Sequence, residues 1–267
     1  MKVALIQLNA GPDKKANLRR CCAFVREAAG RGAKFILLPE MFNFRGTLTG
    51  PRDVHNAVEK IPGESTQALL DLARTLKRFI LAGSLMEKAR GKSKAFNTSV
   101  LINPAGKIVQ RYRKIHLFDA ALGKTKVKES NFFLAGAAPV LASVDGFRLG
   151  MSICYDVRFP ELYRTYGRRG ADILAVPSSF TRATGQAHWE VLLRARAIEN
   201  LCYVLAPGQV GVDGKGVRAH GNSLVVNPWG EVLARGSGHR EEIVYADIEH
   251  AVLKKSRQIL PGIQKIN

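Results

Sequence analysis

Three residues with reactive side chains come at or directly after segments that have the apolar pattern of buried strands. Glu40 and Lys114 each follow such a segment, and Cys154 ends the segment 149–154, after which residues 156–161 open an expected helix. In an open α/β sheet, ligands gather beyond the carboxyl ends of the strands. A cysteine at a strand-to-helix turn can be a nucleophile, a carboxylate can take its proton, and a lysine can stabilise an oxyanion. The pattern is compatible with a cysteine-based catalytic site.

Each of these residues also has an ordinary structural explanation. Cys154 can be a small buried apolar side chain, Glu40 an acid in a surface loop, and Lys114 a solvated charge in the basic run 111–114. The three other cysteines lie on apolar faces and are expected in the core: Cys21, Cys22 and Cys202. Spacing alone leaves the catalytic and structural interpretations open.

The sequence lacks the motifs of metal-binding, phosphate-binding and dinucleotide-binding sites. The six histidines show no spacing typical of metal ligands. The sequence contains neither a P-loop nor a glycine-rich dinucleotide fingerprint. We therefore expect no metal and no cofactor, because nucleophile, base and oxyanion donors can all come from the chain.

Short apolar segments alternate with amphipathic ones, which is typical of a layered α/β fold. Helices are expected at 17–30, 65–78 (capped by Ser65 or Thr66), 159–169 and 187–200. Strands are expected at 3–8, 35–38, 79–86, 97–103, 107–112, 147–154, 172–176, 202–206, 221–227, 231–235 and 242–248.

Two pairs of segments repeat in the same order. Residues 31–42 and 169–180 share five of twelve positions, and residues 98–111 and 222–235 share five of fourteen. This repetition predicts two similar halves, built as two helix-covered sheets packed face to face. No Pro/Gly/Ser-rich linker separates the halves, so we expect residues 1–267 to form a single domain.

The net charge of +19 is unusual for a chain with 46% apolar and 24% charged residues. The basic residues occur in small groups along the whole chain, which favours a solvated surface that attracts anionic ligands. A polyanion-binding scaffold is the alternative from a different class. No basic arm, helix-turn-helix signal or zinc-finger spacing occurs, so we expect no specific nucleic-acid partner.

Composition excludes several other classes of protein. The apolar and charged fractions are those of globular proteins rather than of disordered or collagen-like chains. Four cysteines are too few for a disulfide scaffold, and no apolar run reaches the roughly 18 residues of a membrane span. The apolar stretch near the N-terminus, residues 3–8, is shorter than a secretory signal requires. We expect a soluble cytoplasmic protein with no membrane partner.

Seven segments together resemble the carbon–nitrogen hydrolase, or nitrilase, superfamily along essentially the whole chain. They are VALIQLN at 3–9, LLPEMF at 37–42, YRKIHLFD at 112–119, ESNFFLAG at 129–136, SICYDVRFPEL at 152–162, TGQAHWEVLLRARAIEN at 184–200 and NPWG at 227–230. The resemblance implies a four-layer αββα sandwich of two pseudo-repeated halves. It also implies a homodimer or a larger homo-oligomer.

The resemblance assigns roles to individual residues. Glu40, Lys114 and Cys154 stand where the family carries its Glu-Lys-Cys triad. Glu129 matches a second family glutamate that orients the lysine and the substrate, and the backbone N–H of Tyr155 matches an oxyanion donor. The implied chemistry is amide hydrolysis through a thioester on the cysteine.

Substrate contacts are expected around the same cleft. Arg158 lies about one turn past Cys154, although an ion pair with Glu161 or another acid would also explain it. Three further residues follow the expected strand 172–176: Ser179, Phe180 and Thr181.

The string Cys154-Tyr155-Asp156 is similar to the amidase branches and differs from the Cys-Trp-Glu of true nitrilases. The wider sequence most resembles the branch that hydrolyses deaminated glutathione, a small anionic amide. An omega-amidase acting on 2-oxoglutaramate and an N-carbamoyl amino acid hydrolase remain alternatives. Three segments depart from the family pattern and bear on substrate preference: 124–128, 220–223 and 260–267.

Overall fold

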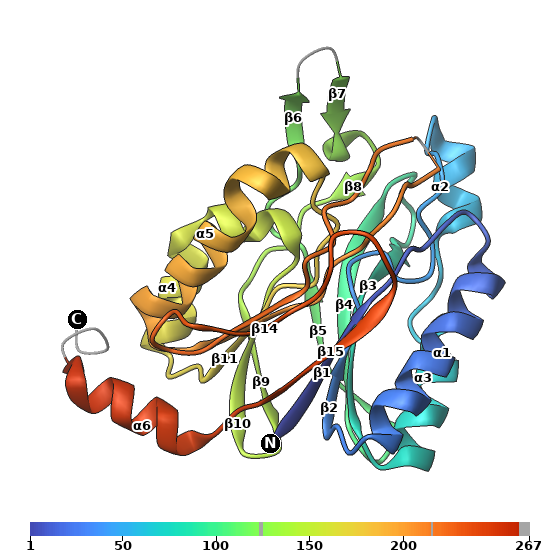
Figure 1. The fold of residues 1–267 in the computed structure, drawn as a ribbon. Coiled ribbons are helices and arrows are strands. Elements are labelled where there is room, and N and C mark those ends of the chain that lie inside the picture. Colours follow the sequence, from blue (N-terminus) through green and yellow to red (C-terminus); the bar gives the residue numbers. More distant parts are fainter. Residues whose placement is uncertain (123–124, 215, 262–267) are drawn as a thin grey trace.

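Two β-sheets pack face to face, and each is covered on its outer side by a pair of helices. The computed structural model describes residues 1–122, 125–214 and 216–261. Figure 1 shows α1 and α3 outside one sheet and α4 and α5 outside the other. The four layers of helix, sheet, sheet and helix confirm the fold class expected from the sequence.

The first sheet has the strand order β15-β1-β2-β3-β4-β5, and β8 pairs with β4. Its strands are β1 (Lys2–Gln7), β2 (Phe35–Leu37), β3 (Phe79–Lys88), β4 (Ala95–Ile102), β5 (Ile108–Arg113), β8 (Phe133–Leu134) and β15 (Glu242–Asp247). The helices that cover it are α1 (Lys14–Gly30) and α3 (Glu64–Leu76). Because β1, β2 and β3 are parallel, their carboxyl ends lie at one edge of the sheet.

The second sheet has the order β14-β13-β12-β11-β10-β9. Its strands are β9 (Val140–Val144), β10 (Phe147–Met151), β11 (Ile173–Ala175), β12 (Tyr203–Ala206), β13 (Leu224–Val226) and β14 (Val232–Arg235). Its helices are α4 (Pro160–Arg168) and α5 (Arg182–Asn200). Outside the sandwich layers lie α2 (Pro51–Ala57), α6 (His250–Ile259) and a small hairpin of β6 (Asp119–Leu122) and β7 (Thr125–Lys128).

The two sheets have the same topology, which confirms the expected pair of similar halves. In each sheet a central strand, β2 or β11, lies between two parallel neighbours. An antiparallel hairpin, β4–β5 or β13–β14, follows at one side, and one antiparallel strand, β15 or β9, closes the other. The central strands and the hairpins are the segments that echo each other in the sequence.

Alternation of side chains along β1 explains how one strand contributes to two layers. Val3 and Leu5 belong to the core between the sheets, whereas Ala4 and Ile6 belong to the core under α1 and α3. Successive side chains of a strand point to opposite faces, so a strand that is covered on both faces is apolar throughout. This is why such segments read as continuous apolar runs in the sequence.

Several expected boundaries are wrong because side-chain caps decide them. α1 begins three residues earlier than expected because Asp13 accepts a hydrogen bond from the N–H of Ala16 at 3.0 Å. α5 begins at Arg182 because Thr181 caps it. The N-cap of α3 is Gly63 rather than Ser65 or Thr66, and Thr66 instead accepts the Gly63 N–H at 2.7 Å.

Some expectations fall outside the described residues or are corrected by them. Lys124 and residues 262–267, which belong to two of the divergent segments, lie outside the described part of the chain. Cys21 and Cys202 are buried as expected, but Cys22 is only half-buried. In the described residues no helix is long and apolar enough to cross a membrane.

Candidate active site

Glu40 lies in a loop that follows β2 and is held against an irregular part of β3. The pairing of β3 with β4 shifts register there, next to Gly83 and Ser84. Ser84 donates its N–H to the carbonyl of Pro39 at 3.3 Å, and its Oγ accepts the N–H of Met41 at 3.0 Å. A Cβ on Gly83 would lie 2.1 Å from the Pro39 carbonyl oxygen, so only glycine permits this approach. The residues before and after Glu40 are therefore both bonded to Ser84, which fixes the backbone that carries the Glu40 carboxylate.

Lys114 follows β5 and points between two carboxylates. Its Nζ lies 3.0 Å from Oε1 of Glu40 and 2.9 Å from Oε2 of Glu129, and its side chain is only 1% exposed. The Asn97 side chain on β4 also donates to Oε1 of Glu40, at 2.9 Å, and the Asn97 carbonyl accepts the Lys114 N–H. The ammonium is thus fixed by its backbone and by two acids.

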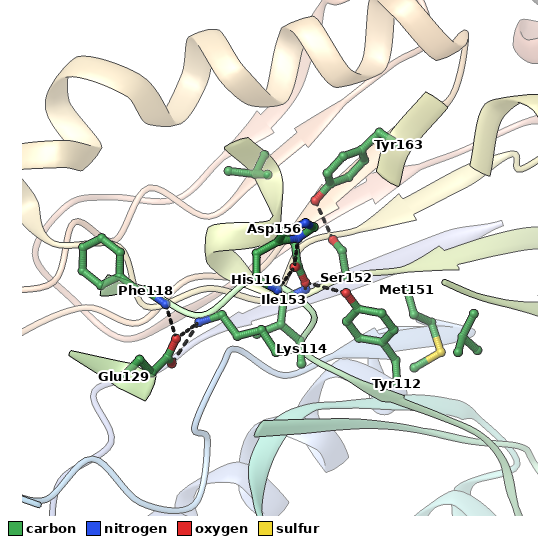
Figure 2. Close-up of polar contacts among 12 residues, drawn as sticks. Tyr112, Lys114, His116, Phe118, Glu129, Met151, Ser152, Ile153, Asp156 and Tyr163 are labelled. Carbon is green, nitrogen blue, oxygen red and sulfur yellow. Dashed lines mark hydrogen bonds and ion pairs between the residues drawn. The ribbon is translucent and has the colours of Figure 1, made fainter. Parts of the chain in front are cut away.

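Glu129 begins a single 3₁₀ turn, Glu129–Asn131, after the β6–β7 hairpin. Figure 2 shows its carboxylate between the Lys114 ammonium and the backbone N–H of Phe118, which it accepts at 2.6 Å. Both oxygens are therefore occupied by donors on the segment that carries Lys114. This arrangement orients the lysine side chain rather than leaving it mobile.

Cys154 stands in a strained turn between β10 and α4. The expected strand over 147–154 ends at Met151, and Cys154 instead begins a 3₁₀ helix, Cys154–Arg158. Its φ is +48°, a conformation uncommon for a side chain other than glycine. The carbonyl of Pro177, beyond β11, accepts the Cys154 N–H at 3.0 Å. Backbone strain of this kind is frequent at functional sites, where the surroundings hold it in place.

The charges of the cluster determine its protonation. Burial and the nearby Glu40 carboxylate raise the pKa of the Cys154 thiol well above its ordinary value, although Lys114 and the Ser179 N–H act in the opposite direction. Burial disfavours the Lys114 ammonium, but Glu129 and Glu40 outweigh it and hold the pKa of Lys114 well above its usual range. Burial also raises the pKa of Glu129. At neutral pH the site therefore contains a thiol and an ammonium.

Asp156 joins the two segments that carry Lys114 and Cys154. It is fully buried and accepts the hydroxyl of Tyr112 at 2.7 Å, the Nδ1 of His116 at 2.8 Å and the N–H of Ile153 at 2.9 Å. In the sequence this aspartate marks an expected helix start and belongs to the Cys-Tyr-Asp string, but neither pattern predicts these contacts. A carboxylate two residues after Cys154 was the available signal, as was the polar run that Asn97 begins within the strand Ala95–Ile102.

The expected substrate-contacting residues lie next to Cys154, on the 3₁₀ turn and on the loop after β11. The guanidinium of Arg158 lies 5.6 Å from the ring centre of Tyr155 and 5.4 Å from that of Phe180, and its Nη1 is 3.3 Å from Nδ1 of His188. The described residues contain no ion pair between Arg158 and Glu161.

The loop after β11 is tied to the same turn through its backbone. The Pro177 carbonyl accepts the Cys154 N–H at 3.0 Å, and the Ser179 N–H lowers the pKa of Cys154. Thr181 accepts the N–H of Thr184 and caps α5, so its hydroxyl is engaged in the helix start. Within the described residues no group of three or more metal-ligating side chains is assembled.

The two-halved αββα sandwich, with reactive side chains at its strand ends, defines the class of nitrilase-fold enzymes. The chain belongs to the carbon-nitrogen hydrolase family, whose family model matches residues 2–258. It is therefore a hydrolase that acts on carbon–nitrogen bonds of amide type.

Two curated relatives and one solved structure illustrate the similarity. The chain is 42% identical over 261 residues to omega-amidase NIT2 of Homo sapiens, covering 97% of this chain and 92% of that protein. It is 39% identical over 265 residues to a deaminated glutathione amidase of Synechocystis, covering 98% and 96%. The C. elegans NitFhit protein has 34% identity and a TM-score of 0.91 over 100% of this chain, which spans 65% of that longer protein.

Proposed function

We propose that this protein is a cysteine amidase in which Cys154 is the nucleophile, Glu40 the general base and Lys114 an oxyanion donor. The observation that carries the proposal is the contact of the Lys114 ammonium with the buried carboxylate of Glu40 and the partly buried carboxylate of Glu129, next to a buried thiol. A lysine shared in this way stays charged in a site from which water is largely excluded. Such a site can supply a nucleophile, a proton acceptor and positive charge together.

In the first step Glu40 takes the thiol proton as the sulfur attacks the amide carbonyl. The raised pKa of Cys154 means that the thiolate is not present beforehand, so the proton must move during the attack. The carbonyl oxygen becomes an oxyanion as its π bond breaks. Glu40 serves as the base because its carboxylate lies beside both the thiol and the ammonium.

The oxyanion is stabilised by Lys114 and by the backbone N–H of Tyr155. Tyr155 lies in the first turn of the 3₁₀ helix, where N–H groups have no partner inside the helix. Removal of one donor of this kind typically costs about 2.7–4 kcal/mol in the barrier. Glu40 then gives its proton to the departing nitrogen, which leaves a thioester on Cys154. Glu40 next removes a proton from water as the water attacks the thioester. The C–S bond then breaks, Glu40 gives this proton to the departing sulfur, and the acid is released.

We further propose that the acyl group transferred to Cys154 is 2-oxoglutaryl, joined through its C5 carbonyl. Deaminated glutathione is the substrate in the name of one relative, and 2-oxoglutaramate is the omega-amidase substrate that the sequence resemblance implies. The two share this group and differ in the amine that leaves. The first releases cysteinylglycine and the second releases ammonia. Deaminated glutathione is our preferred substrate, and the 42% identity to the omega-amidase favours 2-oxoglutaramate as the second candidate.

Arg158 is the group that we propose binds the carboxylate of this acyl chain. It is on the same 3₁₀ turn as Cys154, and its guanidinium lies 5.4 Å from the ring centre of Phe180, which directly follows Ser179 on the loop after β11. A guanidinium binds carboxylates with two parallel hydrogen bonds and keeps its charge at every relevant pH. The side chain thus complements an anionic amide.

The proposal is tested by comparing Cys154→Ala with Cys22→Ala, a change at a free cysteine on α1. Cysteinylglycine release from deaminated glutathione and ammonia release from 2-oxoglutaramate are measured for both variants. Cys154→Ala should lose at least about 10³-fold in kcat, and Cys22→Ala should keep it. Full turnover by folded Cys154→Ala would overturn the mechanism. If the protein hydrolysed only N-carbamoyl amino acids, the proposed identity of the acyl group would be wrong.

We also propose that the protein forms a homodimer through the outer face of α5. Four large apolar side chains are exposed there and on the adjoining β13–β14 hairpin: Val191, Ile198, Trp229 and Leu233. The turn of that hairpin touches α5, because a Cβ on Gly230 would lie 2.6 Å from Ile198. Contiguous apolar surface of this kind is typical of protein interfaces.

A further inference from the structure

Asp156 receives its hydrogen bonds from two segments that belong to different sheets. One segment contains Tyr112 and His116, which stand two residues before and two residues after Lys114. The other contains Ile153, which directly precedes Cys154. Figure 2 shows the carboxylate between these two segments. The contact therefore spans the junction between the first sheet, where β5 ends, and the second sheet, where β10 ends.

All four donors are within ordinary hydrogen-bond distance of the carboxylate. Oδ1 accepts the backbone N–H of His116 at 3.0 Å and its Nδ1 at 2.8 Å. Oδ2 accepts the Tyr112 hydroxyl at 2.7 Å and the Ile153 N–H at 2.9 Å. A fully buried carboxylate with this many donors is held in one orientation, because loss of any bond leaves a buried polar group unpaired.

Capping of the 3₁₀ helix explains only a part of this arrangement. A cap needs the bond to Ile153, which is at the N-cap position of that helix. The bonds from Tyr112 and His116 come from outside the helix and serve no purpose for it. Their common feature is that they flank Lys114 closely in the chain.

His116 is itself fixed on its other side. Its ring stacks on Phe159 with centroids 3.6 Å apart, and Phe159 directly follows the 3₁₀ helix that Cys154 begins. The imidazole thus contacts the nucleophile-bearing turn twice, once through Asp156 and once through Phe159. The end of β5 cannot move relative to this turn without breaking these contacts.

We propose that Asp156 is a positioning residue that sets the separation between the Cys154 sulfur and the Lys114 ammonium. It acts by bonding the segments on which both stand, and it holds the strained backbone of Cys154 in place. It touches neither substrate nor the reacting atoms. The inference rests on the proposed function, since it presupposes that sulfur and ammonium act on one carbonyl group.

The experiment compares Asp156→Asn with Asp172→Asn in the full-length chain. Asp172 is also a buried aspartate with several donors, among them Arg257 and the N–H of Arg148, but it is not bonded to either catalytic segment. The variants are assayed with deaminated glutathione and 2-oxoglutaramate, and active sites are counted by stoichiometric alkylation of Cys154. Thermal unfolding is followed in parallel.

Asp156→Asn should lower kcat per alkylated site by about 10- to 100-fold, with KM changed less than about threefold, because a small misplacement of reacting groups is enough for such a loss. Asp172→Asn should keep kcat per site even where it lowers the melting temperature. A kcat per site in Asp156→Asn within twofold of the unchanged protein would overturn the positioning role. If Cys154→Ala kept its turnover, the proposed function itself would fail, so the two failures are distinguishable.

Tyr112→Phe decides the question should Asp156→Asn not fold. This variant removes one hydroxyl and leaves the aspartate with three donors. A folded Tyr112→Phe protein should lose about three- to tenfold in kcat per site at unchanged KM. Unchanged kcat per site in this variant would overturn the proposal.

Discussion

The ammonium of Lys114 lies 3.0 Å from the carboxylate of Glu40, although 74 residues separate them in the chain. Both side chains are almost completely buried, so their attraction is weakly screened by solvent. Glu129 completes the group from the other side at 2.9 Å. One positive charge is therefore shared by two acids, and removal of the lysine leaves both carboxylates without a cation.

Replacement of the lysine should damage both activity and stability. Lys114→Met leaves Glu40 and Glu129 without their cation, and the folded protein should then take up a proton. We expect kcat/KM to fall by at least about 10²-fold. The free energy of unfolding of Lys114→Met should increase as the pH falls from about 8 to about 5, because the folded variant then binds more protons than its unfolded state.

Kinetic assays and pH-dependent thermal unfolding measure these two effects. Lys107→Met is a matched control, because this lysine is exposed beyond the β4–β5 turn. The control should change neither quantity appreciably. Equal stability of Lys114→Met and the unchanged protein at about pH 8 would contradict the charge balance inferred here.

Glu40→Gln should increase the thiolate fraction of Cys154 but decrease amide turnover. The Glu40 carboxylate raises the pKa of Cys154, so its neutralisation should lower that pKa and increase the thiolate fraction. Amide turnover should nevertheless fall by about 10²-fold or more, because the general base is lost. The pH dependence of Cys154 alkylation by iodoacetamide, followed by mass spectrometry, measures the first effect. A midpoint that moves to higher pH would refute this interpretation.

Gly83→Ala should disturb the loop that carries Glu40. The added Cβ would lie 2.0 Å from the Leu38 carbonyl oxygen and 2.1 Å from that of Pro39, so the backbone must shift. Such overpacking typically costs about 1–3 kcal/mol of stability. Gly11→Ala, with no atom within 4 Å of the new Cβ, is the control. The denaturant concentration at the midpoint of unfolding and kcat should both decrease for Gly83→Ala, and neither should change for Gly11→Ala.

Arg158→Gln should separate anionic from neutral substrates. If the guanidinium binds the substrate carboxylate, KM for 2-oxoglutaramate should rise by about tenfold or more, which corresponds to a lost charge-assisted hydrogen bond of about 1.5–3 kcal/mol. The kcat/KM for an uncharged aliphatic amide should stay within about threefold. A similar decrease in kcat/KM for both substrates would indicate that Arg158 acts by packing on the rings of Phe180 and Tyr155 and does not bind the carboxylate.

The apolar face of α5 can be tested through the state of assembly. Val191 is 68% exposed, so Val191→Glu should not affect the fold of an isolated subunit. A glutamate buried between two copies would lack a partner, and we expect dissociation to monomers in analytical ultracentrifugation. Val109→Glu, at a half-exposed valine on β5, is the control and should keep the assembly. An unchanged sedimentation coefficient for Val191→Glu would exclude this face.

Much of the fold follows from local patterns in the sequence. Apolar runs such as residues 3–8 and 35–38 match β1 and β2 because strands buried on both faces must be apolar throughout. The internal echo predicted two equivalent sheets because similar segments favour similar local structure. Local patterns failed at α2 and α6, and at helix starts such as that of α3, where Gly63 is the N-cap.

The order of residues along the chain shows which reactive side chains stand at the ends of apolar segments, and the family motifs point to Glu40, Lys114, Glu129 and Cys154. The folded chain adds that Lys114 lies between two acids and that the buried Asp156 bonds the segments of Lys114 and Cys154. These contacts join residues 74 and 44 positions apart, whose approach depends on sheet pairing and on the packing of one sheet against the other. Periodicity reports which face of an element is buried, but it contains no information about which distant side chain that face will meet.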